Sequence, residues 1–111
     1  MINVYTQEFG KDYSQERFMT DAWSFGCFDE DANGNNGEEF LTSDAKEAGF
    51  NTNLEYWSSK AFQESENLKI AIETFASLFS DSWLAYCREC YYEVNKLSNG
   101  NYQLIFVTYD R

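Results

Sequence analysis

Apolar residues are spaced most regularly in the second half of the chain, where they predict a helix over residues 64–79. They recur at intervals of three and four, which places them on one side of a helix. These positions are Leu68, Ala71, Ile72, Phe75, Ala76 and Phe79. Residues 13–25 show the same kind of spacing and predict a second amphipathic helix, with Asp12 or Ser14 as its N-cap.

The C-terminal residues predict a β-hairpin around the dipeptide Asn99-Gly100. Asn-Gly is the preferred pair for a two-residue type I′ turn, because both positions need a positive φ. A two-residue loop places Ser98 opposite Asn101, and the pairing of the two strands then follows by counting. The face that we assign to the core pairs Val94 with Ile105, Tyr92 with Val107 and Cys90 with Tyr109.

Shorter segments complete the predicted order of elements. They are a strand over residues 2–6, a loop over 29–37, a short helix over 43–48 that Gly49 ends, and a segment over 54–58 that fits either a strand or an early start of the long helix. Residues 83–91 fit either the first hairpin strand or a helix. The order predicts a single α+β domain over residues 1–111. We expect a small antiparallel sheet that includes the C-terminal hairpin, with one long and one or two short helices packed on one face.

Composition argues for a folded binding protein rather than an enzyme. The 111 residues are 43% hydrophobic and 19% aromatic, which is enough for a core despite the charge. The chain has no His, the most frequent general base and metal ligand near neutral pH. Its six glycines are scattered and form no phosphate-binding loop. We therefore expect no catalysis and no cofactor.

Residues 29–34 match the opening of a calcium-binding loop, D-x-D-x-N-G. The twelfth position of such a loop needs a bidentate Glu, and here it is Phe40. We therefore interpret this segment as a solvated acidic turn and expect no metal.

Cys27, Cys87 and Cys90 are an odd number of cysteines, which favours reduced thiols. Cys87 and Cys90 form a C-x-x-C motif, but aromatic residues flank it and the sequence lacks the strand-to-helix context of a redox site. We expect ordinary thiols. The N-terminal residues contain no basic segment followed by an apolar one, and no apolar run approaches the ~20 residues of a membrane span. These features predict a cytoplasmic protein with no membrane partner.

The net charge of −11 is distributed unevenly along the chain. Residues 1–59 carry 12 acidic and 3 basic residues, whereas residues 60–111 carry 7 and 5. Residues 18–45 contain seven acids and no base. This window predicts an anionic surface that binds a basic protein and does not bind nucleic acid directly. The predicted partner-binding residues are Asp21, Asp29, Glu30, Asp31, Glu38, Glu39, Asp44, Glu47, Trp23 and Phe28.

Two kinds of inhibitory protein share this small, acidic, aromatic-rich character. One is the immunity protein that neutralises a basic nuclease toxin by covering its active site. The other is the nucleic-acid mimic that blocks a DNA-binding defence enzyme. A domain roughly 30 Å across would have to match about 18 phosphates of a duplex, more than the net −11 of this chain. The charge therefore favours the immunity protein, with the DNA mimic as the alternative. An adaptor or subunit without inhibitory action, or binding through an added strand at a sheet edge, is also compatible with the sequence.

Overall fold

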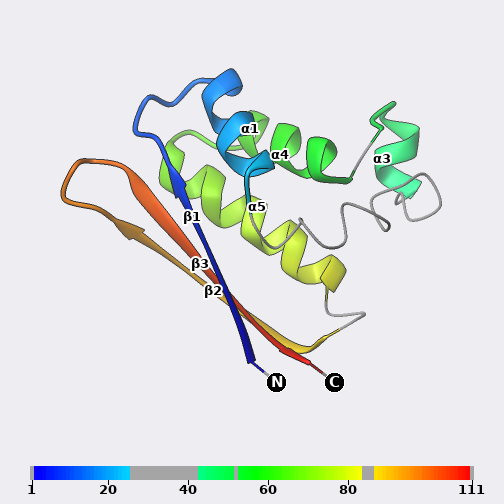
Figure 1. Cartoon of the computed structure of the whole chain (residues 1–111). Coiled ribbons are helices and arrows are strands. Elements are labelled where there is room, and N and C mark those ends of the chain that lie inside the picture. The colour runs from blue at the N-terminus through cyan, green and yellow to red at the C-terminus, as the bar shows by residue number, and fades with distance from the viewer. Residues whose placement is uncertain (1, 26–42, 52, 84–86, 111) are drawn as a thin grey trace.

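The computed structural model describes residues 2–25, 43–51, 53–83 and 87–110. In chain order its elements are β1 (Ile2–Phe9), α1 (Gln15–Trp23), α3 (Ser43–Glu47), α4 (Asn53–Gln63), α5 (Leu68–Trp83), β2 (Cys87–Lys96) and β3 (Tyr102–Asp110). Figure 1 shows one antiparallel three-stranded sheet with the helices on one side of it. The predicted α+β fold with a C-terminal hairpin is confirmed.

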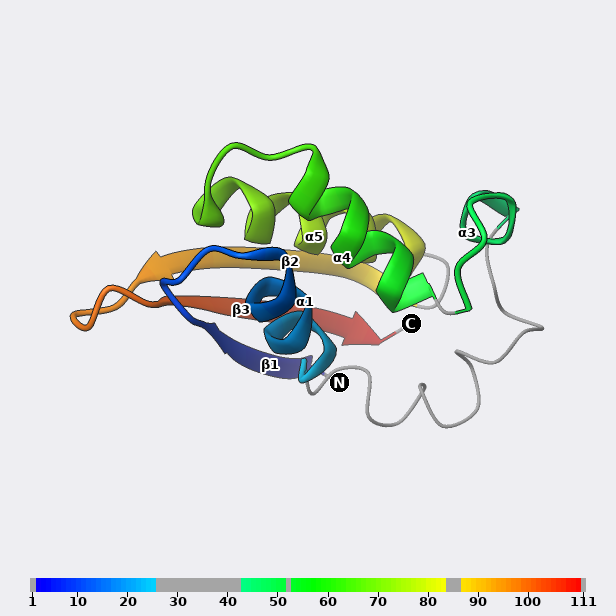
Figure 2. The same ribbon diagram turned by 90° about the horizontal axis from the view of Figure 1, so that it is seen from above.

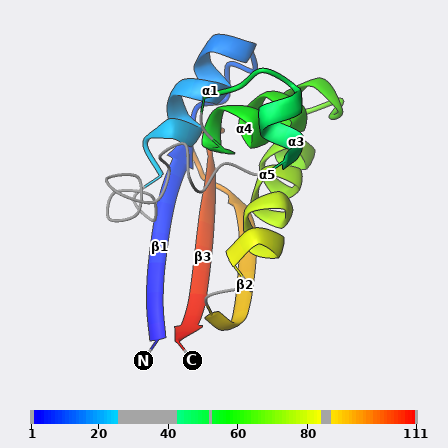
Figure 3. The same cartoon turned by 90° about the vertical axis from the view of Figure 1, so that its right-hand side faces the viewer.

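The sheet has the order β1-β3-β2, so β3, which follows the other two described strands in the sequence, lies in its centre. β1 pairs with β3 from Ile2↔Tyr109 to Phe9↔Tyr102, which brings the two ends of the chain side by side (Figure 3). β1 is longer than the predicted strand over residues 2–6 because its backbone pairing continues as far as Phe9, whose buried ring anchors it.

The predicted register of the hairpin is wrong by one residue. The amide of Leu97 donates to the carbonyl of Asn101 (2.7 Å), and the amide of Gly100 donates to the carbonyl of Leu97 (3.0 Å). These bonds enclose three loop residues instead of two. Among the described residues only glycines have a positive φ, and Gly100 has φ +92°. The turn is therefore not type I′, because Asn99 does not adopt the required conformation; its side chain accepts from the Asn101 amide instead (2.9 Å).

The extra loop residue changes which side chains of β3 face the core. Val94 now pairs with Leu104 and Tyr92 with Phe106. Because side chains alternate along a strand, a shift of one residue moves a whole set to the other face. Leu104 and Phe106 are fully buried beneath the helices, whereas Ile105, Val107 and Tyr109, which we assigned to the core, lie on the opposite face.

The described residues form four helices, one more than the predicted order contains. Residues 53–63 form the separate helix α4, which settles the ambiguous segment 54–58 as helix, and α5 begins at Leu68 rather than at residue 64. The side chain of Asn67, directly before α5, accepts a hydrogen bond from the Ile70 amide (3.0 Å) and so caps the N-terminus of the helix. Ser14 is the N-cap of α1, because its hydroxyl accepts a hydrogen bond from the Arg17 amide (3.2 Å). It was one of the two residues predicted for this position.

The core lies between the helices and the inner face of the sheet. Figure 2 shows the helices and the strands from above. It is built largely from phenylalanines. The ring of Phe75 on α5 lies within 6.5 Å (centroid to centroid) of three others, in β1, in α1 and just after α1. Phe79 connects the same group to Phe106 of the central strand at 4.9 Å. The predicted stripe of the long helix is thus confirmed as a core surface.

Candidate functional site

The described part of the predicted partner-binding surface begins at the C-terminal end of α1. Trp23 remains 47% exposed although it is one of the largest apolar side chains of the protein. Its indole N–H donates to the hydroxyl of Ser58 on α4 (3.2 Å), and that hydroxyl donates to the carbonyl of Leu54 (2.8 Å). The buried Ser58 therefore holds one edge of the indole, and about half of Trp23 remains exposed to solvent.

An open groove of about 420 Å³ runs along this side of α1. Its lining residues are Gln15, Glu16, Met19, Thr20 and Trp23. Glu16 is exposed in the first turn of the helix, and Met19 lies one turn before Trp23. An anchored aromatic ring beside a flexible thioether and a carboxylate is a composition typical of protein-binding surfaces. The sequence analysis did not select Glu16 or Met19, although their spacing from Trp23 indicates a shared helix face.

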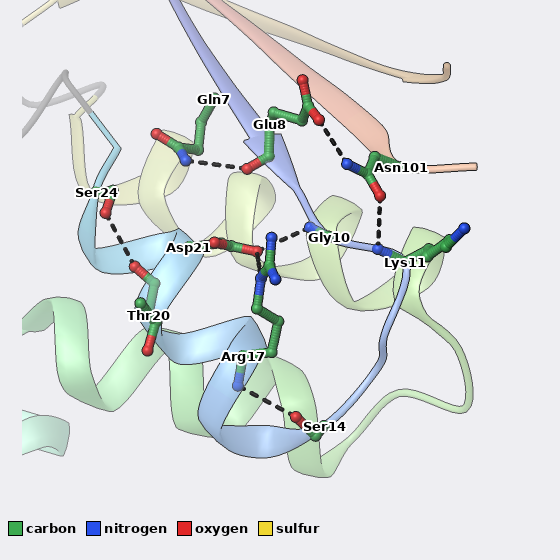
Figure 4. A network of polar contacts seen from close by, with 10 residues as sticks. All are labelled: Gln7, Glu8, Gly10, Lys11, Ser14, Arg17, Thr20, Asp21, Ser24 and Asn101. Carbon is green, nitrogen blue, oxygen red and sulfur yellow. Dashed lines mark hydrogen bonds and ion pairs between the residues drawn. The ribbon is translucent and has the colours of Figure 1, made fainter. Parts of the chain in front are cut away.

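Asp21 has a structural role in the same helix. One of its carboxylate oxygens accepts from the Gly10 amide (2.8 Å) and from the Arg17 guanidinium (2.8 Å), as Figure 4 shows. Its side chain is only 14% exposed. The hydrogen bond and charge of Asp21 raise the pKa of Arg17. This carboxylate joins α1 to the end of β1, so its charge is largely compensated within the fold.

Two further predicted residues, Asp44 and Glu47, lie exposed on the short helix α3. The buried Ala45 between them faces the rest of the protein. The pKa of Lys60 on α4 is raised mainly by its 2.6 Å ion pair with Glu64, and the charge of Asp44 adds to this effect. Asp44 is therefore close enough to act on the charge of Lys60.

The structure places the described site residues at the two ends of the helical layer, because α4 lies between α1 and α3 in Figure 3. Trp23 and Asp21 belong to the α1 end, and Asp44 and Glu47 to the α3 end. The other predicted residues lie outside the described residues, as does the calcium-like loop: Phe28, Asp29, Glu30, Asp31, Glu38 and Glu39. They follow α1 and precede α3 in the chain, so the acidic window joins the two ends.

The two thiols of the C-x-x-C motif face the helices together. A bulge at Arg88 interrupts the alternation of β2, since Cys87 pairs with Asp110 and Glu89 with Tyr109. This places Cys87 and Cys90 on the same side of the strand, with Cys87 buried and Cys90 partly buried. Desolvation, and then the neighbouring Cys87, raise the pKa of Cys90 to about 11. In the described parts of the chain, no three His, Cys, Asp or Glu side chains are grouped as metal ligands.

The raised pKa predicts slow alkylation of Cys90 by iodoacetamide at about pH 8. A rise from 9.0 to about 11 lowers the thiolate fraction roughly a hundredfold, and the greater nucleophilicity of a more basic thiolate recovers about tenfold. We expect Cys90 to react about ten times more slowly in the folded protein than in denaturant. Peptide-resolved mass spectrometry measures this, because trypsin cleaves after Arg88 and separates Cys87 from Cys90. Equal rates would contradict the expectation, because they would show that the fold does not suppress the reactivity of Cys90.

Comparisons with models of protein families, with curated proteins and with solved structures find no match for this chain. In the ranges that the structure describes, no helix has the length and apolar character needed to cross a bilayer.

Proposed function

We propose that this protein is a non-catalytic, cytoplasmic inhibitor that binds a basic protein, specifically an immunity protein that neutralises a cognate nuclease-type toxin. The observation that carries the proposal is the acidic window, residues 18–45, in which seven acids occur without a single base. The active site of a nuclease is lined with Lys and Arg that hold phosphates. A surface with several carboxylates can occupy these cations and block the site.

The geometry at the ends of the window supports this proposal. Asp44 and Glu47 point into solvent on α3, so their charges are available to a partner. At the other end, the fixed and exposed Trp23 supplies apolar area for burial. Binding hot spots combine a buried aromatic anchor with charged groups around it. Acids would accelerate the encounter with a basic toxin, and Trp23 would slow its dissociation.

The alternative of a DNA mimic is less well supported by the dimensions of the molecule. Its longest principal extent is 38 Å, and a B-DNA segment of that length carries about 22 phosphates. The net charge of the chain is −11, about half of that number. A toxin site with a few Lys and Arg needs only a few carboxylates, so the sparse charge fits a cognate protein better than a duplex mimic.

A nuclease inhibition assay with competitor DNA tests the proposal. Any basic nuclease encoded beside this protein is the candidate toxin, and it is compared with a panel of unrelated basic nucleases. We expect complete inhibition of the cognate enzyme at a 1:1 ratio, persisting in excess catalytically inert duplex DNA, and no inhibition of the panel. Inhibition across the panel that duplex DNA relieves would instead establish the mimic. If the neighbouring protein retains full activity, the immunity function is wrong.

A further inference from the structure

The face of the sheet opposite the helices carries a continuous set of apolar side chains. The register places Val4, Val107 and Tyr91 in one row across the three strands. Adjacent rows add three more, so that this surface, the outer sheet face, consists of Ile2, Val4, Tyr91, Ile105, Val107 and Tyr109. Ile2, Val4 and Tyr91 are 59%, 61% and 53% exposed. Figure 1 shows that no described helix covers this side.

Aromatic side chains on this face are held in fixed positions. The rings of Tyr91 and Tyr109 meet edge to face, with centroids 5.7 Å apart. The guanidinium of Arg88 lies 5.8 Å from the centroid of the Tyr109 ring. The Tyr91 hydroxyl donates to Glu89 (3.0 Å), which orients the exposed ring. Tyr and Arg are the residue types most enriched in binding hot spots, and rings that are already ordered lose little entropy on binding.

The size of the outer sheet face fits one helix better than a second copy of the protein. The whole outer side of the three strands, about 4.8 Å apart and eight residues long, covers roughly 10 by 26 Å between strand axes, or about 400 Å² with side chains. The six apolar residues occupy the part of it from the Ile2 row to the Ile105 row, about 14 Å along the strands. A stable dimer buries about 800 Å² on each partner. An α-helix is about 10 Å wide, and about 17 residues span 26 Å. The inner face already accepts α5, a helix of 16 residues.

The charges around the outer sheet face indicate which kind of helix can bind there. Glu89 and Glu93 lie beside the apolar residues on β2, and Arg88 lies against the Tyr109 ring. Glu8 lies one row beyond the apolar residues, where its carboxylate accepts from the Asn101 side chain and its charge, in addition to that of Asp21, raises the pKa of Arg17. Two copies face to face would bring the same carboxylates together, which disfavours self-association. Lys or Arg beside an apolar stripe would pair with them. We infer that the outer sheet face docks a cationic amphipathic helix of a partner protein, about 17 residues long. This surface lies opposite the helical layer and does not depend on the inhibitory function.

A synthetic peptide of about 17 residues provides the probe. It contains only Leu and Lys, with Leu at intervals of three and four, so that a folded helix has one apolar side. A scrambled peptide of the same composition and an analogue with Glu in place of Lys serve as comparisons. We expect titration calorimetry to show binding of the amphipathic Lys peptide at least about tenfold tighter than of either comparison peptide. Amide chemical shifts are expected to change along β1, β2 and β3 rather than in α1 and α4.

Two pairs of variants locate the binding site. Val4→Ala with Tyr91→Ala retains the net charge and is expected to weaken binding about tenfold, whereas Ile70→Ala, at an exposed position of α5, changes it less than about twofold. Glu89→Gln with Glu93→Gln is expected to weaken binding about fivefold at low salt. The matched control Glu66→Gln with Asp81→Asn removes the same charge elsewhere. The inference is overturned if the scrambled peptide binds equally well, or if the sheet variants bind like the wild type. Dimers of the wild-type protein that dissociate in the variant Val4→Ala with Tyr91→Ala would also overturn it, because the outer sheet face would then bind a second copy.

Discussion

Replacing Phe75 by alanine is expected to lower the free energy of unfolding by about 3–5 kcal/mol. Phe75 is fully buried, and its ring contacts those of Phe9, Phe18 and Phe25. The truncation removes the common neighbour of three rings that belong to different segments, so the cavity cannot close by the movement of one element. For a domain of this size the loss corresponds to a fall in Tm of roughly 15 °C or more. Thermal and urea unfolding, followed by circular dichroism, measure it.

Ile70→Ala is the matched control for this variant, because it also shortens an apolar side chain of α5. Ile70 is 42% exposed on the solvent side of that helix. Its replacement is expected to change the stability by less than about 0.5 kcal/mol. If the two variants lost equal stability, α5 would not pack on the sheet in the orientation described.

Reversing two charges of α3, Asp44→Lys with Glu47→Lys, is expected to weaken binding of the cognate toxin about a hundredfold. Both side chains are exposed, so the substitutions replace attraction to a basic partner by repulsion without disturbing the core. Changes in surface charge act mainly on the association rate, by up to a few orders of magnitude at low salt. Stopped-flow or surface-binding kinetics at low and high ionic strength measure the effect, which high salt is expected to reduce.

The double variant Glu66→Lys with Asp81→Lys changes the net charge by the same amount at exposed positions outside the acidic window. It is expected to slow association by less than about fivefold, since only the overall field changes. Equal effects of the two double variants would show that net charge alone, rather than the acidic window, accounts for binding.

The elements predicted correctly from the sequence are those whose signal is local and repeated. The stripe from Leu68 to Phe79 includes several turns of one helix, so small uncertainties at its ends do not change which side is buried. The predicted register of the hairpin, in contrast, depended on the length of one turn. The Asn99 side chain accepts a hydrogen bond from the Asn101 amide, and the φ of Asn99 stays negative. The turn therefore has one more residue than predicted, and the side chains of β3 that were assigned to the core lie on the opposite face. Alternation alone did not reveal the mistake, because both faces of β3 are apolar.

The sequence predicts the candidate site as a region and does not distinguish the role of each residue in it. The absence of bases between Arg17 and Lys46 is visible in the sequence, and Asp44 and Glu47 are exposed as this hypothesis requires. The role of Asp21 was not visible, because it depends on the Gly10 amide, eleven residues earlier and brought close by the fold. A charge count treats all acids as equal, whereas the fold compensates some of them and leaves others exposed.

The position of β3 in the centre of the sheet has a consequence for how the protein is made. β1 is translated before β2 and β3, and its only partner strand among the described residues, β3, follows about a hundred positions later. Until Tyr102–Asp110 emerges, β1 and β2 lack the strand that pairs with both of them. The phenylalanines of the helices then have no complete sheet to pack against. At translation rates of about 5–20 residues per second, the nascent chain spends seconds in this state. The sheet therefore closes in one late step, and premature termination before Tyr102 would remove its central strand and leave β1 and β2 unpaired.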